Sequence, residues 1–199
     1  RLGYDDPLIP TWKNILAKLV PYPADNNGLK IAAEIPLGTA HRHWSHLFAI
    51  FPLYILNWDQ PESRELIAKS VDHWVNLDID SLTPAMKKWA ESLRSPVHVN
   101  AKGGGGLRTY SFYAAASMYA SMGNGEKAHA SLLTHLNGYS KEMERRKDRR
   151  GISANGNYFE GDSVIESSFS PMASIQNMLL QSWGDKIRVF HAMPKAWPE

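Results

Sequence analysis

The fold is decided by residues 107–136, which read LRTYSFYAAASMYASMGNGEKAHASLLTHL. Residues 107–122 are rich in alanine and serine, small side chains that allow two helices to pack closely, and alanine is also the strongest helix former. Gly123, Asn124 and Gly125 then interrupt the helix with a turn. The apolar spacing resumes over residues 126–136 and indicates a returning helix. The stretch therefore predicts an antiparallel helical hairpin.

Five further stretches around this hairpin are predicted to be helical. They are residues 12–20, 48–56, 60–77, 83–95 and 170–183. Residues 48–56 are apolar nearly all round, so we expect a buried helix that Pro52 kinks or ends. Ser170-Pro171 is expected to open the last helix, because proline is favoured in the first turn, and Glu166 would then stand just ahead of it.

Each amphipathic helix has a set of apolar residues that we expect to face inward. These sets are Trp12, Ile15, Leu16, Leu19 and Val20 in the first helix, Leu66, Ile67, Val71, Trp74 and Val75 in the third, and Met172, Ile175, Met178 and Leu179 in the last. The best strand signal is the alternation of Ile187, Val189 and His191 with their neighbours. The chain is thus expected to be all-α until a strand begins near its C-terminus.

The helical hairpins can either close into a toroid or stack into a solenoid. No repeat of about 34 or 40 residues is visible, which weakens the solenoid. The chain of 199 residues, 43% of them apolar, is long enough for one domain with a sizeable core.

Composition also excludes several classes of partner. The net charge of +2 argues against nucleic acid, and no apolar run approaches the length of a membrane span. The absence of cysteine excludes disulfides and thiol chemistry. Since Arg1 begins in what reads as the middle of a domain, we expect an upstream part of the same polypeptide, with any signal peptide there.

Residues 39–47 hold three histidines, an arginine and a tryptophan. If a helix starts near His41, then His43 and His46 share a face with Leu47. Imidazole and guanidinium groups together suit hydroxyls and carboxylates. A metal site is disfavoured, because His41 and His43 lie about 200° apart on a helix and no cysteine or matching carboxylate motif supports one. The third interpretation is that these histidines only cap and pack a helix end.

Several sequence blocks occur in an order that resembles a known family. They are Pro21-Tyr22-Pro23, His41-Arg42-His43-Trp44-Ser45-His46-Leu47, Met122-Gly123-Asn124-Gly125-Glu126-Lys127-Ala128, Met178-Leu179-Leu180-Gln181-Ser182-Trp183-Gly184, Ile187 and Met193-Pro194-Lys195-Ala196-Trp197-Pro198. This order resembles the C-terminal part of the catalytic module of glycoside hydrolase family 95, the α-L-fucosidase family. The resemblance covers most of the chain with gaps, and the histidine block and the tail are its most specific parts.

The resemblance implies that residues 1–183 form the C-terminal part of an (α/α)6 barrel and that residues 184–199 begin a C-terminal β-domain. It implies an inverting glycosidase, secreted or periplasmic, that acts on a terminal α-L-fucosyl or α-L-galactosyl unit of an oligo- or polysaccharide. No metal and no cofactor is expected. In the family, an arginine–histidine pair of the histidine block lines the sugar pocket, which corresponds to Arg42 and His43. The family's general acid would lie upstream of Arg1.

The family's general base is an aspartate in an Asp-Gly-Asn-Phe block, and here residues 165–169 read Ile-Glu-Ser-Ser-Phe. Glu166 is therefore the candidate general base, with a side chain one methylene longer. An inverting enzyme holds its two carboxyl groups roughly 6.5–9.5 Å apart, so the longer side chain shifts the attacking water unless backbone or substrate also shifts. The alternatives are that Glu166 only binds a hydroxyl group, or that it caps the helix that follows.

The other candidate residues also have alternatives. Arg42 either contacts sugar or holds an acidic side chain, His43 binds a hydroxyl group or belongs to the core, and Trp44 stacks on a pyranose ring or packs. The remaining candidates are His41 and Asn157 for substrate binding, Arg108, and the reserve carboxylates Glu160 and Asp162. The alternative functions are a catalytically inactive carbohydrate-binding helical module and a structural scaffold for protein partners.

Overall fold

The computed structural model is mostly helical in the parts of the chain that it describes. These parts are residues 5–38, 42–77, 107, 109–134, 150–152, 158–160 and 165–197. The α-helices are α1 (Ile9–Ala17), α2 (Arg64–Asn76), α4 (Thr109–Ser121), α5 (Gly125–Leu133) and α7 (Ile165–Leu179). The strands are β1 (Ala24–Asp25), β2 (Gly28–Leu29), β3 (Arg150–Ile152), β4 (Tyr158–Glu160), β5 (Leu180–Gln181) and β6 (Arg188–Val189), and two 3-10 turns cover Ser45–Leu47 and Pro61–Ser63.

The strands form three separate antiparallel pairs, β1–β2, β3–β4 and β5–β6. Among the described helices, none combines the length and the apolar run that a bilayer span requires.

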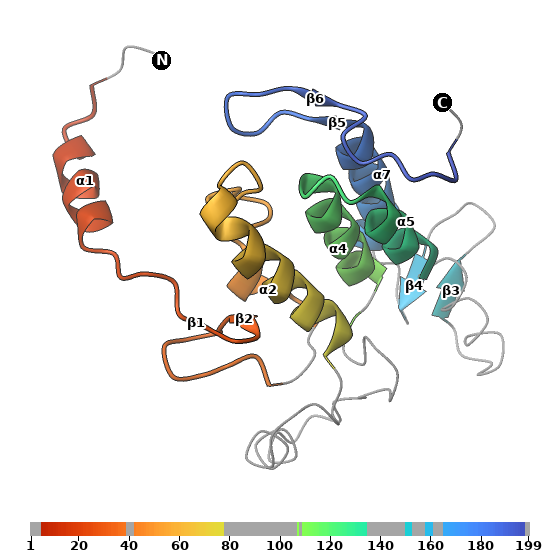
Figure 1. Cartoon of the computed structure of the whole chain (residues 1–199), viewed down its shortest axis with the longest axis horizontal. Helices are drawn as coiled ribbons and strands as arrows, with labels where there is room; N and C mark the ends of the chain where they lie inside the picture. Colours follow the sequence, from red (N-terminus) through yellow and green to blue (C-terminus); the bar gives the residue numbers. More distant parts are fainter. Residues whose placement is uncertain are drawn as a thin grey trace.

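The predicted hairpin of α4 and α5 is confirmed, and α4 is the centre of the core (Figure 1). The consecutive residues 113–120 of α4 are all buried, and most of them are small, so α5 and α7 can approach α4 closely. The turn between the helices has Gly123 in the left-handed region at φ +73°, which favours glycine. Asn124 then caps α5, because its side-chain oxygen accepts a hydrogen bond from the Lys127 backbone N–H at 3.0 Å.

Helix α7 runs parallel to α4, as a ladder of side-chain hydrogen bonds shows. Ser174 Oγ of α7 donates to the Tyr113 carbonyl of α4 at 2.7 Å. Gln181 Nε2 donates to the Ala120 carbonyl at 2.8 Å, near the ends of both. The N-terminal ends of α4 and α7 therefore point in the same direction, with α7 beginning about 7.5 Å before the level of the first residue of α4.

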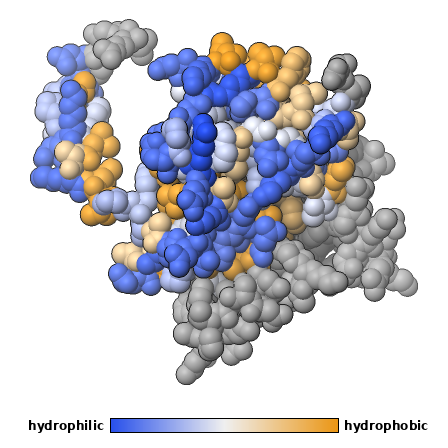
Figure 2. Space-filling view, viewed as in Figure 1, coloured by the Kyte–Doolittle hydropathy of each residue, from blue (hydrophilic) through white to orange (hydrophobic). Residues whose placement is uncertain are grey.

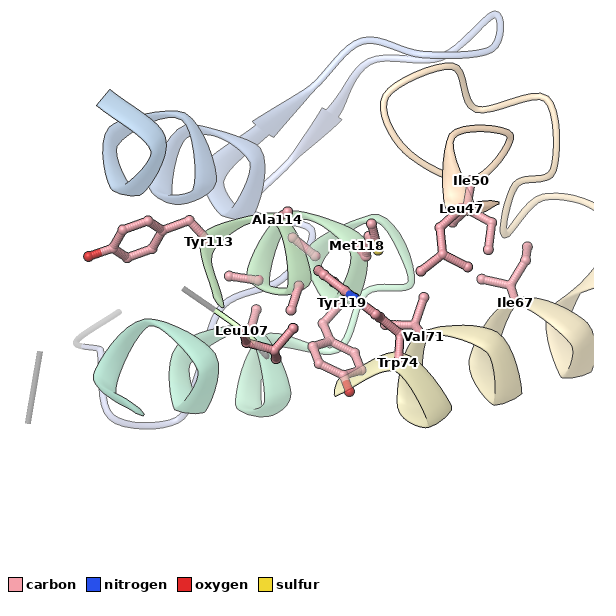
Figure 3. Packing of buried hydrophobic residues seen from close by; sticks show 14 of the residues in the cluster. Leu47, Ile50, Ile67, Val71, Trp74, Leu107, Tyr113, Ala114, Met118 and Tyr119 are labelled. Atoms are coloured by element: carbon pink, nitrogen blue, oxygen red, sulfur yellow. The ribbon is translucent and has the colours of Figure 1, made fainter. Parts of the chain in front are cut away.

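Helix α2 covers the opposite side of α4 and follows the prediction for residues 60–77. Ile67, Val71 and Trp74 are buried, and Figure 3 shows Val71 and Trp74 beside Met118 and Tyr119 of α4. Burying one such large side chain contributes about 1.5–3 kcal/mol, so this face of α2 stabilises its packing on α4.

A polar contact joins α2, α4 and α5 at the edge of this core. The Tyr119 hydroxyl donates to Asp72 Oδ1 at 2.8 Å, and Lys127 Nζ lies 2.8 Å from both carboxylate oxygens. Burial, followed by the hydrogen bond to Asp72, raises the pKa of Tyr119. The hydroxyl therefore stays protonated and keeps its role as donor.

The β1–β2 hairpin docks on α2 at a point where a side chain would not fit. Gly28 has φ +117°, and a Cβ atom added there would lie 2.5 Å from Ser70 Oγ and 2.6 Å from Ser70 Cα. The same hydroxyl accepts a hydrogen bond from the Leu29 backbone N–H at 2.8 Å. This close approach requires glycine at position 28.

A stack of aromatic and charged groups fastens the β5–β6 hairpin to the loop before α2. The Tyr54 and Trp183 rings stack with centroids 5.1 Å apart, and the Arg188 guanidinium lies 3.6 Å over the Trp183 ring. Arg188 also pairs with Asp59, which Lys186 contacts at 3.2 Å. The stack therefore connects segments 129 residues apart in the sequence.

The helix predicted over residues 48–56 is wrong. The chain there forms only turns after the 3-10 turn Ser45–Leu47, and Phe48, Leu53 and Ile55 are exposed. Pro52 lacks a backbone N–H and so cannot continue a helix. Leu47, Ala49 and Ile50 are buried, and Leu47 and Ile50 lie near Ile67 in the core (Figure 3).

Two predictions of inward faces are wrong, the second of them in part. The first helix, predicted over residues 12–20, ends at Ala17; it stands apart from the body (Figure 1), and none of its residues is buried. Helix α7 begins at Ile165 rather than Ser170, with Pro171 inside it. Met172 and Ile175 point outward, while Ser174 and Met178 face α4.

The predicted C-terminal strand is shorter than expected. It consists of Arg188 and Val189, which pair with Gln181 and Leu180 directly after α7. A C-terminal β-domain beginning at residue 184 stays a prediction.

Candidate functional site

Arg42 and His43 lie at the N-terminal end of α4. Ser111 Oγ donates to the Arg42 carbonyl at 2.7 Å, which fixes the backbone of this pair against the first turn of the helix. Arg42 Nε donates to His43 Nε2 at 3.2 Å. The His43 ring also lies 5.8 Å from the Tyr110 ring. The pair therefore presents the guanidinium cation of Arg42 beside the imidazole ring of His43.

Both side chains of this pair are exposed to solvent. A guanidinium group keeps several donors in a fixed fork when one of them is used, and such forks bind hydroxyl and carboxylate oxygens. The pair can therefore hold a polar ligand at this end of α4.

Trp44 packs between two helices. Its ring centroid lies 5.8 Å from that of Trp74 on α2 and 6.3 Å from that of Tyr110 on α4. Its indole N–H donates to the Phe51 carbonyl at 3.2 Å. The ring is half-buried and its polar atom is bonded, which matches the packing alternative rather than an open stacking platform.

The prediction that His43 and His46 share a helix face is wrong. No α-helix starts near this pair, because only the 3-10 turn Ser45–Leu47 forms, and it turns His46 inward while His43 stays exposed. His46 Nε2 is buried without a hydrogen-bond partner. Burial, with a smaller contribution from the neighbouring His73, lowers the pKa of His46 to about 4. His46 is therefore a neutral core residue at neutral pH.

Glu166 lies in the first turn of α7 and is exposed. It does not stand ahead of the helix as predicted, because the apolar spacing of Ile165 and Phe169 extends the helix toward the N-terminus, and Pro171 costs it only one backbone donor. The Ser170 hydroxyl donates to the Glu166 carbonyl within the helix.

The parallel arrangement of α4 and α7 brings Glu166 to the same end of the molecule as Arg42 and His43. Ser174 and Tyr113 mark one level of the two helices. At a rise of about 1.5 Å per residue, Glu166 lies roughly 12 Å before that level and Tyr110 roughly 4.5 Å before it. The carboxylate is thus about two helical turns or less from the level of the His43 ring, on the adjacent helix.

The remaining predicted residues are placed only in part. Glu160 ends β4, where its backbone is in register with that of Arg150, and this strand contacts α7. His41, Arg108, Asn157 and Asp162 lie outside the described residues. No group of three or more histidine, aspartate and glutamate side chains within the described segments is arranged to hold a metal ion.

Two residues that sequence reasoning missed support the pair. Tyr110 packs on His43 and Trp44, and Ser111 binds the Arg42 backbone across 69 positions of sequence. Tyr110 and Ser111 lie in the first turn of α4, and the residues that they contact are far upstream in the sequence. No local sequence pattern therefore indicates these contacts.

Comparisons with known proteins assign the chain to no family. No protein-family model matches the chain, and no curated protein matches it.

Proposed function

We propose that the chain is the C-terminal part of the barrel of an inverting glycoside hydrolase, similar to the α-L-fucosidases of family 95. The observation that carries this proposal is the placement of Arg42 and His43 against the first turn of α4 and of the exposed Glu166 in the first turn of α7, the parallel helix beside it. Polar donors beside a carboxylate are the groups that a glycosidase needs to bind a sugar and activate water.

The helix arrangement supports a toroid. When helical hairpins stand side by side in a ring, the helices of the inner layer run parallel to one another and the outer helices run opposite. Helices α4 and α7 are such a parallel pair, and α5 is the returning helix of the α4–α5 hairpin. We therefore include residues 1–183 in the proposed (α/α)6 barrel, and secretion or a periplasmic location is proposed from the family resemblance.

In the proposed mechanism, Glu166 as carboxylate accepts a proton from a water molecule that attacks the anomeric carbon. A second carboxyl group, upstream of Arg1, donates its proton to the leaving oxygen. Arg42 and His43 hold ring hydroxyl groups and so fix the sugar against this water. The sugar is a terminal α-L-fucosyl or α-L-galactosyl unit.

Turnover of aryl α-L-fucoside and α-L-galactoside by the polypeptide that includes the upstream residues tests this mechanism. Glu166→Gln is expected to lower kcat at least about 100-fold, since a general base typically contributes 10²–10⁴-fold. Glu62→Gln, which changes another exposed carboxylate in the first turn of a helical segment, is the matched control and should leave turnover unchanged. Activity of Glu166→Gln close to that of the parent would remove Glu166 from the mechanism.

A second candidate function is a sugar-binding module without catalysis. It is favoured by the position of Glu166 inside α7, where a carboxylate in the first turn also stabilises the helix. Calorimetric titration with L-fucose and L-galactose separates the two functions. Binding that Arg42→Ala abolishes, in a protein whose turnover is absent with and without Glu166→Gln, would support the binding module.

A further inference from the structure

Helix α1 has an apolar face that the body of the molecule does not cover. Trp12, Ile15 and Leu16 repeat at helical spacing, yet between 48% and 65% of each remains exposed. Leu19 and Val20, just after the helix, are also apolar and exposed. Figure 2 shows apolar surface on this outlying part of the molecule. An isolated helix of nine residues is marginal in water, so a face of this kind is expected to be stabilised by packing.

Helix α7 has a second uncovered apolar face. Its inner side is fixed on α4, but Ile165, Phe169, Met172 and Ile175 follow the spacing i, i+4, i+7, i+10 on the outer side. Between 40% and 66% of each of these residues is exposed. The outer side of α7 is therefore a continuous apolar stripe, the pattern that receives another helix.

The two faces match in length and in charge. Helix α1 is about 14 Å long, and the stripe from Ile165 to Ile175 covers about 15 Å at the same rise per residue. The charged residue within α1 is Lys13, and the charged residue within α7 is Glu166. Each helix thus brings a charge opposite to that of the other, beside an apolar face of equal length.

The α1 and α7 of one chain are badly placed to meet. Figure 1 shows them on opposite sides of the molecule, with α2 and α4 between them. Six residues, 18–23, connect Ala17 to β1, and a segment of that length spans about 20 Å when fully extended. Since β1 is held to β2 and β2 to α2, this connection keeps α1 on its own side. The α1 of the same chain is therefore not a suitable occupant of the α7 stripe.

We propose that two copies of the chain form a symmetric dimer in which the α1 of each copy packs on the α7 stripe of the other. A two-fold axis produces two identical contacts, each using the faces described above. If the seven side chains of one contact bury roughly 90 Å² each, the two contacts together bury roughly 1,300 Å², within the range of specific interfaces of about 1,200–2,000 Å². The proposal uses Glu166 only as a neighbouring charge, and its test measures mass rather than turnover.

Sedimentation of the chain measures the dimer directly. The expected mass is twice 22.4 kDa. Leu16→Glu on α1 and Met172→Glu on α7 should each return it to 22.4 kDa with an unchanged circular dichroism spectrum. Asn14→Glu, on the polar side of α1, is the matched control and should remain dimeric. A parent chain that sediments as a monomer at micromolar concentration would overturn the proposal.

The lack of cysteine allows the contact itself to be mapped. A mixture of Leu16→Cys and Met172→Cys chains should form a disulfide-linked dimer under mild oxidation, and neither variant alone should. Linkage of Leu16→Cys to itself would show α1 packing on α1. A linked monomer of the double variant would show α1 on the α7 of its own chain. Either result would overturn the proposed exchange.

Discussion

Lowering the pH from about 7.5 to about 5 is expected to destabilise the folded chain through one buried histidine, His46. Burial, with His73 nearby, lowers the pKa of His46 from 6.5 to about 4 in the folded state. The unfolded chain therefore binds a proton at a pH where the folded chain does not. The stability that His46 contributes is present above pH 6.5 and is lost as the pH falls toward 4.

The size of this effect follows from the two pKa values. A pH of 5 lies about 1.5 units below the pKa of His46 in the unfolded chain. Each unit corresponds to about 1.36 kcal/mol, so the free energy of unfolding falls by about 2 kcal/mol. At pH 7.5 this loss of unfolding free energy is below about 0.2 kcal/mol. His46→Leu removes the titrating ring together with its unbonded buried nitrogen and should lose this part of the pH dependence.

Urea denaturation followed by tryptophan fluorescence, repeated across this pH range, measures the difference. His191 also has its pKa lowered by burial, so the comparison of His46→Leu with the parent chain isolates His46. His129→Gln, whose parent ring lies against Trp197 on the far side of α5, is the matched control and should keep the pH dependence of the parent. Parallel curves for His46→Leu and the parent between about pH 7.5 and 5 would show that His46 is not held neutral in the core.

Three further substitutions test the packing. Trp74→Ala, at a fully buried position, should lower the free energy of unfolding by about 3–5 kcal/mol in urea denaturation, and a loss under about 1 kcal/mol would contradict its central place in the core. Gly28→Ala should cost more than about 2 kcal/mol, and Ser70→Ala should fail to rescue it, since backbone atoms of Ser70 stand at 2.6 and 2.7 Å from the added Cβ; full rescue would contradict this geometry. A double-mutant cycle of Asp72→Ala and Lys127→Ala should give a coupling of at most about 1 kcal/mol that high salt weakens, because both side chains are 39–49% exposed; a larger, salt-insensitive coupling would refute that assignment.

The parts of the fold that sequence predicts are those decided by neighbouring residues. The α4–α5 hairpin follows from its small residues and from Gly123 and Asn124, and α2 follows from its regular apolar spacing. The helix prediction for residues 48–56 is wrong because an apolar run without periodicity does not distinguish a helix from packed turns. The prediction that the apolar face of α1 is buried is wrong because spacing predicts an apolar face but not the surface that covers it.

The candidate site depends on contacts that no local pattern encodes. The sequence gives the identities of Arg42, His43 and Glu166. Their placement toward the same end of the molecule requires that α4 and α7 run parallel and that Ser111 holds the backbone of Arg42. The inward turn of His46 likewise depends on a short 3-10 segment in place of a helix. Such placements come from tertiary packing, which overrides local spacing.

The stack of Tyr54, Trp183, Arg188 and Asp59 constrains the order in which the molecule can be completed during synthesis. The loop that holds Tyr54 and Asp59 leaves the ribosome long before its partners on the β5–β6 hairpin. A nascent chain folds its N-terminal elements first, so this loop must remain open until residue 188 has been added. These contacts can therefore form only after residue 188 has left the ribosome, and until then the Tyr54 ring lacks its stacking partner Trp183.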